Sequence, residues 1–116
     1  MTVAGWTLES AKWQFVRLPS EVKWDSHNSL TMAIDRDGQI HLAGNIHAAA
    51  LVYFRTTRKF DIASFEQVPS TVGRDETRRT YPRWIPSPSG DLIFTCRDGG
   101  SGAGDKIVGV TAKRTY

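Results

Sequence analysis

The chain has 116 residues, a length that suits one small domain. Its apolar content of 40 % and charged content of 23 % are ordinary for a globular protein, and interspersed charges leave a net charge of only +3. The sequence has neither a basic stripe for nucleic acid nor an apolar run of about 18 residues for a membrane span, so we predict neither partner. The single cysteine, Cys96, excludes an internal disulfide and a metal cluster built on several cysteines.

Residues 1–26 form the predicted lead-in to the fold, with one outer strand over residues 13–18. This segment contains Trp6, Trp13 and Trp24, and we expect their rings in the core because large aromatic side chains are normally buried. Stacking on a sugar ring is the alternative. The N-terminus lacks a basic segment followed by an apolar one, so no signal peptide is predicted in this chain.

A hairpin is predicted between residues 30 and 43, because apolar residues alternate on both sides of the Asp-Arg-Asp-Gly turn at 35–38. Antiparallel pairing brings the open ends of a hairpin together. We therefore expect His27 and His47 to lie close to each other, whereas His41 falls in mid-strand and is expected to be structural. The turn lacks the other ligands of an EF-hand calcium loop, so turn chemistry is the preferred interpretation.

The remaining strands are predicted over residues 51–56, 64–68, 81–85, 92–96 and 107–111. A polar connection at 72–80 separates the two halves, and a glycine-rich loop at 98–105 lacks the ending of a P-loop. Gly38 and Gly90, 52 residues apart, align the halves as copies of one unit. A strand–turn–strand unit repeated at about this length is typical of β-propeller blades.

The predicted fold is therefore all-β, with about two blades of a β-propeller built from antiparallel four-stranded sheets. Residues 27–71 are the first blade and residues 81–116 a second, incomplete one, within one partial domain over residues 1–116. Propellers close with roughly four to eight blades, so missing blades or self-association are the expected protein contacts. A small closed β-barrel is the structural alternative.

The repeat brings four functional side chains to one face of the propeller: His27 and Tyr81 before or at the start of a strand, and His47 and Arg97 at the end of one. Arg97 can clamp a carboxylate with two parallel hydrogen bonds. Histidine and tyrosine can act as general base and general acid. This set suits β-elimination from a uronic acid polymer, which requires no metal and no organic cofactor.

Four stretches resemble the BNR-repeat-containing propeller proteins and, among them, the ulvan lyases, which are polysaccharide lyases with a seven-bladed propeller. They are DSHNSLTMAIDRDGQIHLAGNIH, LVYFRT, RRTYPRW and FTCRDGGSGAGD, within residues 24–108. The resemblance implies that His27 and His47 are pocket histidines, one of them acting as base or acid, that Tyr81 is the partner, and that Arg97 neutralises the substrate carboxylate.

The implied substrate is an acidic, ulvan-like polysaccharide, and the parent enzyme is expected to be secreted or periplasmic. The expected substrate-binding residues are Asn28, Asn45, Arg83 and Asp98, and no metal ligands are predicted.

Two other functions stay open at this point. A sialidase-like glycoside hydrolase would need carboxylates, and the acids nearest the proposed face are Asp25, Asp98 and Asp105. The repeat turns, however, lack the Ser-x-Asp-x-Gly pattern of sialidase repeats. A non-catalytic carbohydrate-binding propeller piece is the second alternative, which the tryptophans and the short chain favour.

Overall fold

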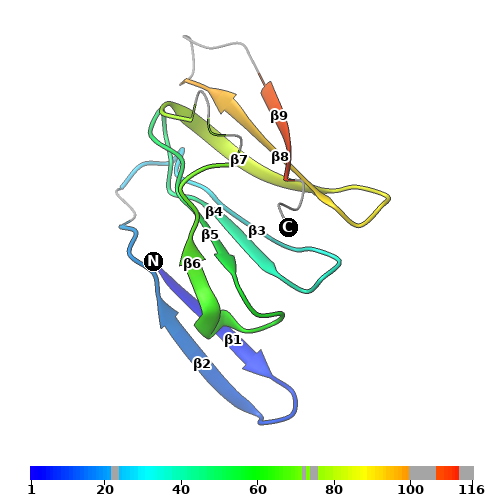
Figure 1. Cartoon of the computed structure of the whole chain (residues 1–116). Coiled ribbons are helices and arrows are strands. Elements are labelled where there is room, and N and C mark those ends of the chain that lie inside the picture. Colours follow the sequence, from blue (N-terminus) through cyan, green and yellow to red (C-terminus); the bar gives the residue numbers. More distant parts are fainter. Residues whose placement is uncertain (22–23, 72, 74–75, 100–106, 113–116) are drawn as a thin grey trace.

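The structure is a computed structural model that describes residues 1–21, 24–71, 73, 76–99 and the backbone of residues 107–112. Three antiparallel sheets follow one another along the chain, with strand orders β1-β2, β3-β4-β5-β6 and β7-β8-β9 (Figure 1). The elements are β1 (Thr2–Thr7), β2 (Lys12–Arg17), β3 (Leu30–Ile34), β4 (Ile40–Gly44), β5 (Tyr53–Thr56), the short 3₁₀ helix η1 (Ile62–Ser64), β6 (Phe65–Gln67), β7 (Arg79–Pro86), β8 (Leu92–Asp98) and β9 (Ile107–Ala112). Within the described residues, no helix is long and apolar enough to cross a membrane.

The β3–β4 hairpin confirms the predicted pairing, with a register that runs from Leu30 opposite Gly44 to Ile34 opposite Ile40. Asp35 organises the turn, because its Oδ1 accepts hydrogen bonds of 2.9 Å from the backbone N–H groups of both Asp37 and Gln39. Gly38 completes the turn with a φ of 82°, a conformation that glycine adopts without a steric penalty.

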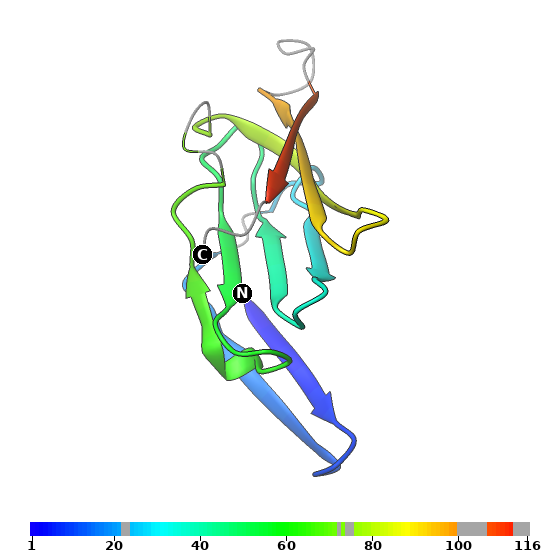
Figure 2. The same ribbon diagram turned by 45° about the vertical axis from the view of Figure 1, so that its right-hand side comes forward.

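The second hairpin, β7–β8, repeats the first, and in Figure 2 it lies beside β3 and β4. Gly90 has a φ of 84°, close to the value at Gly38. The two turns also touch, since the backbone N–H of Arg36 donates to the carbonyl of Gly90 at 3.3 Å. The alignment of Gly38 with Gly90 therefore corresponds to a real structural repeat.

Sheet β3–β6 lies between its neighbours, and its middle strands β4 and β5 are largely buried on both faces. Alternate residues of β3 are exposed, namely Leu30, Met32 and Ile34. Ala43 and Tyr53 on one face belong to a core cluster with Trp84 and Phe94 of the third sheet. On the opposite face, Leu42 and Phe54 of the same strands form a second cluster with Leu18, which follows β2. Antiparallel sheets stacked in this way are neighbouring propeller blades, as the sequence predicts.

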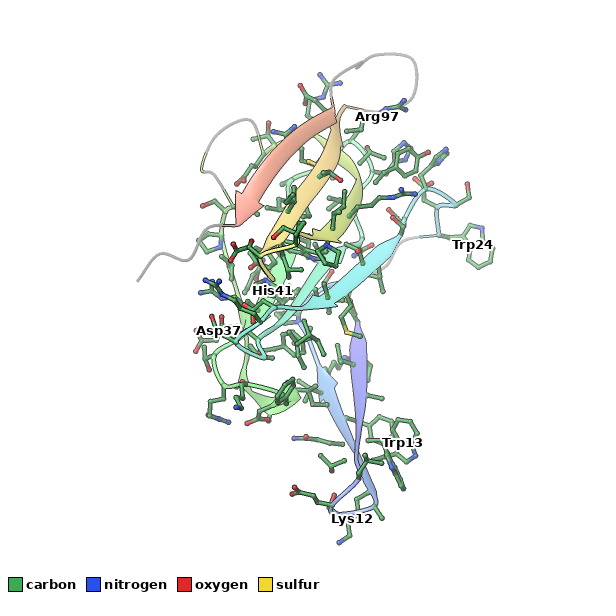
Figure 3. All side chains as sticks on the ribbon, turned by 90° about the vertical axis from the view of Figure 1, so that its right-hand side faces the viewer. Lys12, Trp13, Trp24, Asp37, His41 and Arg97 are labelled. Atoms are coloured by element: carbon green, nitrogen blue, oxygen red, sulfur yellow. The ribbon has the colours of Figure 1, made fainter. Side chains whose placement is uncertain are left out.

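The prediction that the N-terminal tryptophans lie in the core is wrong. Trp6, Trp13 and Trp24 are 48 %, 60 % and 105 % exposed, and Figure 3 shows Trp13 and Trp24 at the surface. Residues 2–7 form a second, unpredicted strand that places Trp6 opposite Trp13, with ring centroids 5.4 Å apart. Both rings point away from the face of this hairpin that packs on the next sheet through Val3 and Val16.

His41 is structural, as predicted, and lies 4 % exposed in the core. Its Nδ1 lies 2.8 Å from the Tyr53 hydroxyl and its Nε2 lies 3.0 Å from Oδ2 of Asp35. Burial raises the pKa of Tyr53 to about 12, so this hydroxyl stays protonated and donates a hydrogen bond to Nδ1. Burial also lowers the pKa of His41, and the opposing effect of Asp35 does not cancel it.

This lowered pKa predicts a specific loss of stability in mild acid. The unfolded chain protonates His41 at about pH 6.5, whereas the folded chain resists protonation to a lower pH. The contribution of His41 to the free energy of unfolding is therefore complete above about pH 6.5, and it is lost as the pH falls through the lower pKa of the folded state. Urea unfolding between pH 7.5 and pH 5 should show this slope in the wild type and a shallower one in His41→Gln; equal slopes would contradict the assignment.

Candidate active site

The open end of the β3–β4 hairpin brings His27 and His47 together, as the sequence predicts. Their ring centroids lie 4.3 Å apart, and the ring planes are inclined by only 26°. The two chain segments approach closely here, because a Cβ atom on Gly44 would lie 2.3 Å from the carbonyl oxygen of Ser29. Glycine at position 44 thus lets the ends of the hairpin converge enough for the two rings to stack.

Asp25 joins the two histidines through a single carboxylate. Its Oδ1 lies 2.8 Å from Nδ1 of His27, and its Oδ2 lies 2.6 Å from Nδ1 of His47. The backbone N–H of His27 also donates to Oδ1 at 2.9 Å. This backbone hydrogen bond, followed by the side-chain bonds from His47 and His27, holds the pKa of Asp25 well below its usual range.

Sequence reasoning named Asp25 merely as an acid near the face and missed its contacts with both rings. A signal was present in the Asp-Ser-His order, because an aspartate often accepts a hydrogen bond from the backbone two residues further on. The contact with His47, 22 residues away, depends on the hairpin and has no local signature.

Tyr81 reaches the histidines from the third sheet through a β-bulge that the sequence did not reveal. Thr80 pairs with Arg97 and Arg83 pairs with Thr95, so Tyr81 and Pro82 together lie opposite one residue of β8. Tyr81 has a φ of 54°, which is rare for a residue with a side chain. Bulges of this kind redirect side chains next to functional sites.

The bulge leaves Tyr81 between a histidine and an arginine. Its ring centroid lies 6.2 Å from that of His27, and Cζ of Arg97 lies 5.9 Å from the Tyr81 ring. The four predicted catalytic side chains therefore form a continuous series across two neighbouring sheets, in the order His47, His27, Tyr81 and Arg97. Figure 3 shows Arg97 near one end of the third sheet, away from Asp37.

A groove of about 790 Å³ lies between β3 and the third sheet, and Tyr81 and Arg97 are among its lining residues. Its lining residues are Ser29, Leu30, Thr31, Tyr81, Pro82, Arg83, Ile85, Thr95, Cys96 and Arg97. Arg83, a predicted substrate-binding residue, contributes a second positive charge to this groove. Burial raises the pKa of the Cys96 thiol, so this side chain lines the groove as a neutral thiol and not as a thiolate.

The other predicted substrate-binding residues, Asn28, Asn45 and Asp98, are not among the residues that line the groove. The side-chain amide of Asn45 donates to Oγ of Ser20 at 2.9 Å and to the carbonyl of Glu21, so it fastens the preceding segment to the hairpin end. The backbone N–H of Asn28 donates to the carbonyl of Asp25 at 3.1 Å.

Asp98 is 53 % exposed, with Oδ1 3.8 Å from Nη1 of the buried Arg79. Most of the glycine-rich loop after it, including Asp105, lies outside the described residues.

Among the residues that the structure describes, one group could hold a metal ion: Asp25, His27 and His47, whose ligand atoms all lie within 4.8 Å of one another. Imidazole nitrogens and a carboxylate oxygen are ligands that zinc accepts. Nδ1 of each histidine is hydrogen-bonded to Asp25, so a metal bound at these two nitrogens would have to replace their hydrogens. The sequence predicts no metal here, and that remains a prediction.

Comparisons with known proteins extend these observations. The model of a family described as "BNR repeat-containing family member" matches residues 1–115. A search of curated proteins finds no match.

Among solved structures, the polysaccharide lyase Uly1 is 18 % identical, with 95 % of this chain and 33 % of that chain covered and a TM-score of 0.76. A PL25 ulvan lyase bound to -[GlcA(1-4)Rha3S]- is 19 % identical, with 92 % and 32 % covered and a TM-score of 0.68.

The chain spans about a third of the length of these two lyase structures. Their likeness to it confirms the propeller architecture, and the family match confirms the resemblance that the sequence motifs indicated. The chain belongs to the BNR repeat-containing family.

Proposed function

We propose that this chain forms the catalytic face of a polysaccharide lyase that cleaves a uronic-acid-containing polymer by β-elimination. The observation that carries the proposal is the series His47, His27, Tyr81 and Arg97, in which Tyr81 and Arg97 line a groove that also contains Arg83. The glucuronate-containing ligand in the similar ulvan lyase structure supports an acidic polysaccharide as the substrate. Such polymers lie outside the cytoplasm, so a secreted or periplasmic location is part of the proposal.

The reaction requires three tasks that these side chains can divide. The proton on C5 of the uronate leaves to a base, the bond from C4 to the glycosidic oxygen breaks, and that oxygen takes a proton from an acid. Arg97 pairs with the uronate carboxylate, which stabilises the negative charge that develops as the C5 proton leaves. Tyr81 and one of the two histidines act as the acid–base pair.

The test is an elimination assay on the protein with an ulvan-like polymer. Elimination creates a C4–C5 double bond that absorbs in the ultraviolet, whereas hydrolysis creates new reducing ends without this absorbance. New reducing ends alone would support a sialidase-like hydrolase instead. Binding without either product would support a carbohydrate-binding module. Either of these two outcomes would refute the lyase proposal.

Replacing Arg97 with lysine should remove most of the activity. Lysine keeps the positive charge but cannot form the two parallel hydrogen bonds of a guanidinium to a carboxylate. We expect kcat/KM to fall by roughly 100-fold, the scale seen when one stabilising donor is lost from an active site. Arg58→Lys is the matched control, because Arg58 is an exposed residue that pairs with Asp61 away from the groove. Near-normal turnover in Arg97→Lys would exclude the proposed clamp.

Replacing Tyr81 with phenylalanine should lower kcat while KM changes little. The substitution keeps the aromatic ring at the bulge and removes only the hydroxyl group that transfers the proton. A loss of about 10²- to 10⁴-fold in kcat is expected for an acid–base group. Thermal unfolding checks that the variant stays folded. A folded variant with unchanged kcat would show that Tyr81 only packs against the substrate.

A further inference from the structure

We propose that Asp25 is a positioning residue that keeps a hydrogen on Nδ1 of both His27 and His47, so that both rings exchange protons only at Nε2. This inference deepens the proposed function and rests on it for its catalytic meaning. Its structural content, the protonation of two named nitrogens, can be tested separately.

The hydrogen-bond geometry determines which nitrogen carries the hydrogen. An ionised carboxylate accepts hydrogen bonds and cannot donate them. Nδ1 of His27, 2.8 Å from Oδ1, and Nδ1 of His47, 2.6 Å from Oδ2, must therefore both be donors. A neutral imidazole with its hydrogen on Nδ1 has a lone pair on Nε2, and a charged imidazole carries hydrogen on both nitrogens. In either state, the proton that comes and goes is the one on Nε2.

The shared carboxylate also explains how the two rings are oriented. Both Nδ1 atoms point toward one small planar group, so the rings extend from it side by side, 4.3 Å apart and inclined by 26°. Both Nε2 atoms then lie on the sides of the rings away from Asp25. The side chains of His27 and His47 are 38 % and 28 % exposed, which leaves room for a substrate to reach them.

The opposite end of the same hairpin provides an internal comparison. There, Asp35 accepts from Nε2 of His41 and Tyr53 donates to Nδ1, so both nitrogens of this ring have protein partners. An aspartate thus contacts histidine at each end of the hairpin, but the rings at the Asp25 end are 38 % and 28 % exposed, whereas the His41 side chain is 5 % exposed.

The decisive variant is Asp25→Asn, which keeps the shape of the side chain. Its amide has one oxygen that accepts and one NH₂ group that donates, so it cannot accept from two Nδ1–H groups at once. We expect one ring to lose its Nδ1 hydrogen while the other keeps it. In the proposed lyase, kcat should fall by roughly 10- to 100-fold, as is typical when a residue that orients a functional histidine is removed, with little change in KM.

Nitrogen-15 NMR of histidine-labelled protein measures the protonation directly, with single His27→Gln and His47→Gln variants to assign the signals. The wild type should show an Nδ1–H on both rings, and Asp25→Asn should show it on one. Asp37→Asn is the matched control, because Asp37 lies in the turn at the other end of the hairpin. This control should change neither the signals nor kcat.

The outcomes separate this inference from the lyase proposal. If the wild type lacks an Nδ1–H on either ring, as it would with a metal bound there, the inference is overturned whether or not the protein is a lyase. If kcat in a folded Asp25→Asn protein equals that of the wild type, the positioning role is overturned. If no elimination product forms at all, the lyase proposal fails, and the wild-type NMR spectrum still decides the protonation. If Asp25→Asn does not fold, the wild-type spectrum alone still tests whether both Nδ1 atoms carry a hydrogen.

Discussion

The antiparallel pairing of β3 with β4 is the constraint on which the fold and the candidate site both depend. At the turn, Asp35 binds two backbone N–H groups and His41, so the turn is tied to the core. At the open end, the missing side chain of Gly44 lets the strands converge. The same pairing places β4 in the middle of the fold, where Ala43 packs in one core cluster and Leu42 in the other. This hairpin therefore contributes both to the core and to the histidine half of the candidate site.

Features encoded in short stretches of sequence could be predicted. Period-2 alternation identified the strands of the β3–β4 hairpin, and Gly38 and Gly90 marked turns that share a positive φ. The proximity of His27 and His47 followed from antiparallel pairing alone, without any knowledge of their surroundings. These predictions succeeded because each depends on the geometry of one strand pair.

Features that depend on a second segment could not be predicted. The exposed rings of Trp6 and Trp13 reflect which face of their hairpin meets the next sheet, and hydrophobicity does not determine that choice. The bulge at Tyr81 becomes visible only when residues are counted on both β7 and β8. The link from Asp25 to His47 crosses the hairpin. In each case, the feature depends on contacts between segments that are distant in the sequence, and the local sequence does not show these contacts.

The bulge has a consequence for how this face can change during evolution. In a regular strand, the direction of a side chain follows from its odd or even position, and no substitution elsewhere can alter that parity. The extra residue opposite Cys96 changes the parity once, at Tyr81. Substitutions along β7 can therefore alter the chemistry or fit of the groove while the direction of Tyr81 persists. Losing that direction would take an insertion or a deletion, a rarer kind of genetic event with a larger structural cost.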